Sequence, residues 1–132
     1  MILGFKQQFT DKTPTNFKEK ILSGEKIHSI RAGDRWMPGM SIQMAYGVRT
    51  KKYDQFNKDH NDLERCKDVQ EIFITCDFNL EITVDDKYLM PWEIDKLIKN
   101  DGLTRLGFIG WFFPKGKWDF SGQIIHWTDF KY

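Results

Sequence analysis

The sequence predicts an α+β fold: a small, mostly antiparallel barrel with two or three short helices at its rim. Three observations lead to this class. The apolar segments follow the order strand, helix, several strands, two helices and a last strand. Strands and helices do not alternate as they do in βαβ folds, and there is no internal repeat. A length of 132 residues suits a single domain over residues 1–132.

The N-terminal part predicts a strand followed by a short helix. Residues 2–5 form an apolar run, which is typical of a strand. Thr13-Pro14 has the form of a helix start, with a capping hydroxyl before a proline at the first helical position. Gly24 suits the left-handed residue that ends a helix. Between these points one apolar helix side is formed by Phe17, Ile21 and Leu22.

Residues 26–32 predict a strand with polar groups on both sides. Alternation places Ser29 and Arg31 on one face and His28 on the other. A strand of this kind often lines a cleft. Lys26 has the wrong parity for the Ser29 face, so it can reach Ser29 only from the turn or from a bulge.

Two segments after this strand contain side chains that could contact a ligand: an aromatic loop and a basic run. Trp36 lies in a turn-rich loop over residues 33–39, where it either stacks on a base beside Arg35 or covers the core. Residues 40–48 predict the next strand. The densest basic run comes directly after it and is either a solvated face or a set of phosphate contacts: Arg49, Lys51 and Lys52.

The middle of the chain predicts a long connection and then further strands. Residues 53–69 are polar and charged, with a helical turn expected around residues 61–66. The run over residues 71–78 is β-branched and aromatic and predicts a strand, which residues 80–84 continue or pair with. Asp85-Asp86 suits a hairpin turn better than a metal site, because no third ligand is suitably spaced.

The C-terminal third predicts two helices and a closing strand. Pro91 starts the first of these helices, and Asn100-Asp101-Gly102 ends it. Thr104 caps a third helix that runs to Phe112. Residues 120–130 alternate well enough for a last strand, whose faces are again of mixed polarity. This mixture is expected of a barrel wall beside a pocket.

Composition excludes a global attraction for nucleic acid or membranes. Twenty Lys and Arg residues against 19 Asp and Glu give a net charge of +1, so any affinity for phosphate must come from a local patch. No apolar run approaches the ~20 residues of a membrane span, and no signal peptide is recognisable, so we expect a cytoplasmic protein without a membrane partner. Cys66 and Cys76 have no zinc spacing and are expected as free thiols, with a disulfide as the alternative. Neither a metal nor a cofactor is predicted.

The stretch from Phe17 to Arg31, with Gly39 behind it, resembles the signature of ASCH domains, which are relatives of the PUA RNA-binding fold. The signature places a phenylalanine before Ile-Leu-x-Gly-x-Lys-x-x-Thr-x-Arg; the chain has Ile21-Leu22-Ser23-Gly24-Glu25-Lys26-Ile27-His28-Ser29-Ile30-Arg31. Residues 100–103 and 120–127 resemble the end of the family pattern. The resemblance covers nearly the whole chain and implies a PUA-like barrel, with residues 51–68 as an insertion relative to the shortest members.

Some ASCH proteins are similar to a hydrolase that removes acetyl groups from acetylated cytidine with a lysine, a threonine and a glutamate. The resemblance assigns these roles to Lys26, Ser29 and Asp101. Ser29 keeps the hydroxyl, and Asp101 is one methylene shorter than glutamate. A hydroxyl becomes a nucleophile when a base takes its proton, and Lys26 could be that base if burial lowers its pKa. Asp101 would orient the lysine or pass a proton to the leaving amine.

Three functions are therefore open. The first is a binding module that holds RNA or a modified nucleoside or nucleotide. Its cleft would be formed by Lys26, Ser29, Arg31 and Asp101, with Trp36 on a base and phosphates on Arg49, Lys51 and Lys52. The second is an amidohydrolase that deacetylates a modified nucleoside. The third is a non-catalytic partner-binding or regulatory domain, in which Lys26, Arg31 and Asp101 form only an ion-pair network at the rim.

Overall fold

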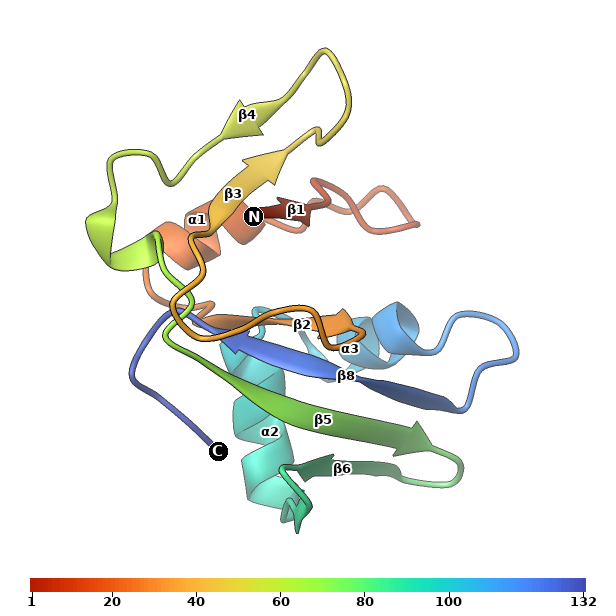
Figure 1. The fold of residues 1–132 in the computed structure, drawn as a ribbon. Helices are drawn as coiled ribbons and strands as arrows, with labels where there is room; N and C mark the ends of the chain where they lie inside the picture. Colours follow the sequence, from red (N-terminus) through yellow and green to blue (C-terminus); the bar gives the residue numbers. More distant parts are fainter.

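The strands form two separate sheets with three α-helices around them (Figure 1), in a computed structural model that describes residues 1–132. The smaller sheet has the order β1 (Ile2–Phe5), β3 (Gln43–Tyr46), β4 (Asp54–Gln55), with β1 and β3 parallel. The larger sheet is antiparallel, in the order β2 (His28–Ala32), β8 (Asp119–His126), β5 (Asp68–Cys76), β6 (Leu80–Val84), β7 (Lys87–Tyr88). The α+β class is thus confirmed. The strand pairs do not close into one barrel.

The helices after residue 90 lie where the sequence predicts them. The helices are α1 (Phe17–Leu22), α2 (Pro91–Asn100) and α3 (Arg105–Phe112), with a 3-10 turn, η1 (Asn61–Leu63), in the long connection. Pro91 occupies the start of α2, and Thr104 Oγ1 accepts the Gly107 N–H at 3.1 Å as the cap of α3. None of these helices combines the length and the hydropathy needed to cross a bilayer.

The predicted start of the first helix is wrong, because residues 11–15 are held in a loop. The helix begins at Phe17, behind Asn16 in a left-handed conformation with φ 55°. The Thr13 N–H donates to Asp11 Oδ1 at 2.9 Å, and Thr15 Oγ1 donates to the Lys6 carbonyl at 2.6 Å. These contacts hold residues 11–15 as a loop, so α1 has six residues and depends on packing for its stability.

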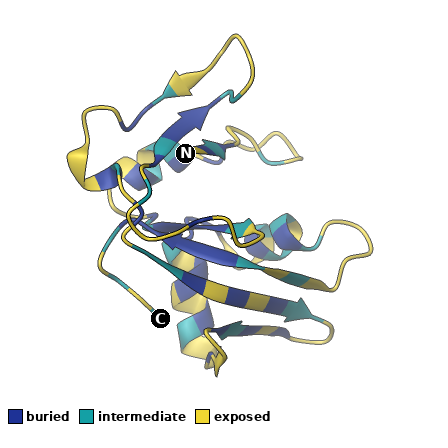
Figure 2. Cartoon of the chain, in the orientation of Figure 1, coloured by how far each residue is buried: buried dark blue, intermediate teal, exposed yellow.

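In the larger sheet, the side chains of β5 are buried on one face only, whereas those in the second half of β8 are buried on both faces. Figure 2 shows β5 alternating between buried and exposed residues, whereas the second half of β8 is buried throughout. The second cover is the loop after β2: Trp36 is 2% exposed, and its N–H and carbonyl both bind the Gln123 amide at 3.0 Å. This loop covers the second face of the last strand, which ends at His126 and not at residue 130.

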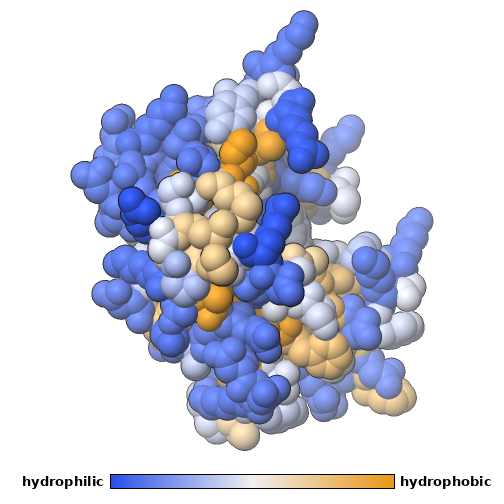
Figure 3. Space-filling model, in the orientation of Figure 1, coloured by the Kyte–Doolittle hydropathy of each residue, from blue (hydrophilic) through white to orange (hydrophobic).

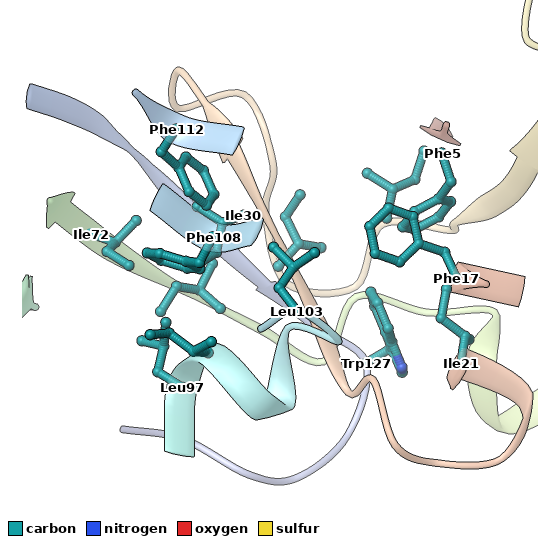
Figure 4. Close-up of a cluster of buried hydrophobic side chains, with 14 of the residues drawn as sticks. Phe5, Phe17, Ile21, Ile30, Ile72, Leu97, Leu103, Phe108, Phe112 and Trp127 are labelled. Atoms are coloured by element: carbon teal, nitrogen blue, oxygen red, sulfur yellow. The ribbon is translucent and has the colours of Figure 1, made fainter. Parts of the chain in front are cut away.

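One hydrophobic cluster joins the two sheets. Figure 4 shows two groups of side chains within it, and Leu103 lies between them. The first group contains Ile72, Leu97, Phe108 and Phe112, and the second contains Phe5, Phe17, Ile21 and Trp127. Leu103 follows α2 directly, so the core fixes the end of α2 against β2. The free thiols expected of Cys66 and Cys76 are confirmed.

Candidate functional site

The end of α2 contacts the turn before β2. This contact explains how Lys26, which strand alternation would place on the face opposite Ser29, can reach the same cavity. The strand begins only at His28, so Lys26 lies in the turn. The Ile27 N–H donates to the Asn100 carbonyl at 2.9 Å. Gly102 is left-handed with φ +78°, and a Cβ there would come within 3.2 Å of Lys26 Cβ and Cδ. A glycine after the helix therefore both ends α2 and makes room for the lysine stem.

Lys26 forms a buried ion pair with Asp101. Lys26 Nζ donates to the Asp101 carbonyl at 2.7 Å and to Asp101 Oδ1 at 2.9 Å, and the two side chains are 3% and 5% exposed. The ammonium thus caps the C-terminus of α2, where the helix dipole favours a cation. A neutral amine has two N–H donors, and these two contacts would use both, leaving the lone pair free.

Burial acts on both partners of this pair. It lowers the pKa of Lys26, against the opposing charge of Asp101. Burial also raises the pKa of Asp101, but the charge of Lys26 and the neighbouring His28 outweigh this effect, so the pKa of Asp101 lies below its usual value. Asp101 is therefore an ionised carboxylate, and Lys26 gives up a proton more readily than a lysine in water.

Ser29 and Arg31 share one face of β2, as the alternation predicts. Arg31 Nε donates to Ser29 Oγ at 3.0 Å, and Arg31 Nη2 donates to the Gly4 carbonyl of β1 at 2.6 Å. The guanidinium lies 5.1 Å from the ring centroid of Phe5. Burial lowers the pKa of Arg31 to about 10, which still leaves it cationic at neutral pH. Ser29 Oγ accepts from Arg31, so its own proton remains free to be donated.

These four side chains line one small cavity. Lys26, Ser29, Arg31 and Asp101 surround it together with apolar neighbours that include Trp111, and its volume is ≈ 70 Å³. That is space for about two water molecules. It is well below the roughly 300 Å³ of an ordinary small-molecule pocket. The cavity can admit a small chemical group but not a whole nucleoside.

Three larger hollows adjoin the cavity, and Arg31 lines all of them. Their volumes are ≈ 590, 640 and 240 Å³. No Asp or Glu lines any of the three. We call these hollows together the basic groove, after the cations that line them: Lys6, Arg31, Arg35, Arg49 and Lys117. Since the whole chain carries only +1, this side of the molecule has a local excess of positive charge.

The structure brings together only some of the residues predicted to bind a ligand. Arg49 lines the basic groove with Arg31, whereas Lys51 and Lys52 are exposed and line none of its hollows. Of the two alternatives for Trp36, the structure shows the cover on the core: the residue lines one hollow, but its side chain is packed into the core at 2% exposure and does not form an exposed stacking ring.

The groove has two aromatic side chains that the sequence reasoning did not single out. Tyr53, which is 43% exposed, and the half-buried Trp111 both line it. They come from segments far apart in the chain, so no local pattern indicates that they meet. The face shown in Figure 3 is mostly hydrophilic, and a narrow hydrophobic strip crosses its middle.

Sequence reasoning also missed His28. Its Nδ1 lies 3.4 Å from Asp101 Oδ1, and its Nε2 lies 2.6 Å from the Tyr132 hydroxyl, which also accepts from Asn100 Nδ2 at 3.0 Å. Burial lowers the pKa of His28, so the ring is neutral at neutral pH. No local pattern indicated it, because alternation places His28 on the face opposite Ser29 and Lys26 reaches the carboxylate from the turn.

Nothing else identifies the chemistry of the site. No group of three or more His, Cys, Asp and Glu side chains is placed to hold a metal ion. Comparisons with protein-family models, with curated proteins and with solved structures find no match for the chain.

Proposed function

We propose that the chain is an ASCH-like domain related to the PUA fold, and that its basic groove binds RNA or a modified nucleotide. The observation that carries this proposal is the groove itself: five cations and no carboxylate line its hollows, in a chain of net charge +1. Such a groove attracts a phosphate backbone. Tyr53 and Trp111 provide rings on which bases can stack.

The cavity adds a second feature to this proposal. Because it is small and joins the groove at Arg31, it suits a substituent of a base rather than the base itself. Lys26 and Ser29 offer polar contacts to such a group, and Phe5 and Phe17 offer apolar ones. A ligand would therefore place its phosphates along the groove and one small substituent in the cavity.

Salt-dependent binding of a short fluorescent single-stranded RNA tests the groove. The variant is the double substitution Arg35→Ala, Arg49→Ala, and the matched control is Lys51→Ala, Lys52→Ala, which removes the same charge outside the groove. We expect the first variant to reduce the slope of log K against log salt by about 1.4, or about 0.7 for each phosphate that the protein no longer neutralises. The control is expected to leave the slope nearly unchanged. Equal slopes for the two variants, or no binding by the parent protein, would contradict the proposal.

A second candidate is amide hydrolysis at the cavity, and one observation favours it. Lys26 and Ser29 line the same cavity, and Lys26 Nζ has two donors on Asp101, so its remaining position could accept a proton from Ser29 if a ligand brought the two groups together. In this reaction Ser29 Oγ would attack the carbonyl carbon of an N-acetyl group while its proton passes to the lysine amine. The C–N bond would then break, the lysine would return the proton to the leaving amine, and water would hydrolyse the acyl-serine.

Incubation with N4-acetylcytidine, followed by chromatography, tests this candidate. We expect cytidine and acetate to form with the parent protein and not with Ser29→Ala. Ser29 is the appropriate residue to change because its side chain accepts only one hydrogen bond, from Arg31. Ser29→Thr should keep activity, because it retains the hydroxyl. No turnover by the parent protein over hours would remove the hydrolase and leave the binding proposal unaffected.

A further inference from the structure

Two buried histidines lie behind the cavity, and the groove uses neither of them. His28 and His126 are both 0% exposed, and their rings meet edge-to-face with centroids 5.6 Å apart. In both rings, Nδ1 has no hydrogen-bond partner. Each has one partner at Nε2: the Tyr132 hydroxyl for His28, and Gln70 Oε1 for His126 at 3.0 Å. Those partners decide which nitrogen carries the proton.

The contacts of Gln70 assign the proton of His126 to Nε2. Gln70 Oε1 accepts the backbone N–H of Tyr132 at 2.9 Å, and Gln70 Nε2 donates to the Tyr132 carbonyl at 2.8 Å. A backbone N–H can only donate and a carbonyl can only accept, so the orientation of the amide is fixed. Its oxygen then requires an N–H from His126 Nε2, and Nδ1 of this ring holds a lone pair.

The contacts of Tyr132 assign the proton of His28 to the other nitrogen. The Tyr132 hydroxyl accepts from Asn100 Nδ2 and has one proton to donate. His28 Nε2, 2.6 Å away, is the acceptor within reach. The proton of the neutral ring is therefore on Nδ1, which faces Asp101 Oδ1 at 3.4 Å. The opposite tautomer would aim a lone pair at a carboxylate oxygen, which can only accept.

We propose that Tyr132 and His28 are positioning residues for the cavity: the Tyr132 hydroxyl favours the Nδ1–H tautomer of His28, and this N–H faces Asp101 Oδ1 beside the Lys26 amine. Lys26 and His28 thus share one carboxylate oxygen. The proposal rests on the proposed function, because such positioning matters only if a ligand reaches Lys26. Neither residue touches the ligand.

The consequence concerns the basicity of Lys26. An N–H that faces the carboxylate offsets part of its charge, so Asp101 stabilises the lysine ammonium less than a carboxylate without that neighbour would. Loss of the Tyr132 hydroxyl would let His28 move its proton to Nε2, and Asp101 would then hold the ammonium more strongly. The Tyr132–His28 contact therefore keeps the lysine easier to deprotonate.

Long-range ¹H–¹⁵N spectra of the labelled protein test the proposal, because protonated and unprotonated ring nitrogens differ in ¹⁵N shift. In the parent protein we expect His28 to be protonated at Nδ1 and His126 at Nε2. Tyr132→Phe should raise the fraction of His28 that is protonated at Nε2 and leave His126 unchanged. Tyr88→Phe, which removes a hydroxyl from an exposed side chain, is the matched control and should change neither ring.

The pH titration of the Lys26 ¹³Cε chemical shift is a second measurement. Its midpoint would not change if Tyr132 only stabilised the fold. We expect its midpoint to rise by about 0.5 to 1 pH unit in Tyr132→Phe. His28 protonated at Nε2 in the parent protein would overturn the proposal, and this spectrum decides even if the variant does not fold. An unchanged His28 in folded Tyr132→Phe would overturn it equally. Correct tautomers in a protein that binds no RNA would contradict the proposed function alone.

Discussion

The buried charges at the end of α2 and the exposed cations of the basic groove differ in how they are compensated: the first are paired within the protein, and the second are not. Lys26, His28 and Asp101 are at most 5% exposed, and each contacts another member of the set. Arg35 and Arg49 are exposed and take part in no ion pair. Charges of the first kind must be paired within the protein because burial is costly, whereas charges of the second kind are free to pair with a ligand. The first set should dominate stability and the second set binding.

The largest effect is expected from breaking the buried pair. Asp101→Ala leaves the Lys26 ammonium buried without its counter-ion, so we expect a loss of about 3–5 kcal/mol in the free energy of unfolding, measured by urea denaturation. Lys26→Met, Asp101→Leu removes both charges and should recover much of that loss, because an apolar pair needs no counter-ion. If the single variant loses less than about 1 kcal/mol, the ion pair is not buried in solution.

A smaller effect is expected from the histidines as the pH falls. Burial lowers the pKa of His126 to about 4 in the folded state, while the unfolded chain protonates it near 6.5. Between these values the unfolded state binds the extra proton, so stability is full above about pH 6.5 and decreases as the pH falls towards about 4. The buried His28, whose pKa is also lowered, acts in the same direction.

Urea denaturation at a series of pH values measures this effect. The loss due to His126 should be on the order of 2–3 kcal/mol across the window. His126→Gln should remove much of the slope between pH 6.5 and 4, since the variant has no proton to bind there. His60, which is exposed, offers the control: His60→Gln should leave the pH profile as it is. A parent protein with constant stability over this range would contradict neutral burial of the histidines.

The smallest effect on stability is expected in the groove, where the effect on binding is large. Arg35→Ala removes an exposed side chain without an ion pair and should change the free energy of unfolding by less than about 0.5 kcal/mol. The same change should weaken RNA binding by about tenfold if it removes a charged contact to phosphate. A variant that unfolds more easily but binds normally would reverse the contrast between the two regions.

Sequence patterns predicted most of the helices and strands and part of the site. These predictions succeeded where the structure depends on residues close together in the chain. Pro91, Thr104 and the Asn100-Asp101-Gly102 stop act within one or two helical turns, so α2 and α3 were found. The start of α1 was misplaced because the Thr13 N–H donates to Asp11 and the Thr15 hydroxyl donates to the Lys6 carbonyl, which keeps these residues in a loop. Ser29 and Arg31 were placed on one face because strand alternation requires it.

The remaining features depend on contacts between distant segments. Whether Trp36 is exposed depends on Gln123, which lies 87 residues further along the chain. The link from His28 to Tyr132 spans 104 residues and has no local signature. The separation of the strands into two sheets is likewise a property of pairing and not of any single run. Such features follow from packing, which a single sequence does not display.

The most direct test of the central claim is to map the bound ligand on the protein. Spectra of ¹⁵N-labelled protein titrated with a short single-stranded RNA should show the largest shifts at the Trp111 indole N–H and at the backbone amides of Arg31, Arg35 and Arg49, which line the basic groove. Lys51, Lys52 and the open face of β5 at Glu71 and Phe73 should shift little. Shifts centred on that open face, or no shifts at saturating RNA, would contradict the account.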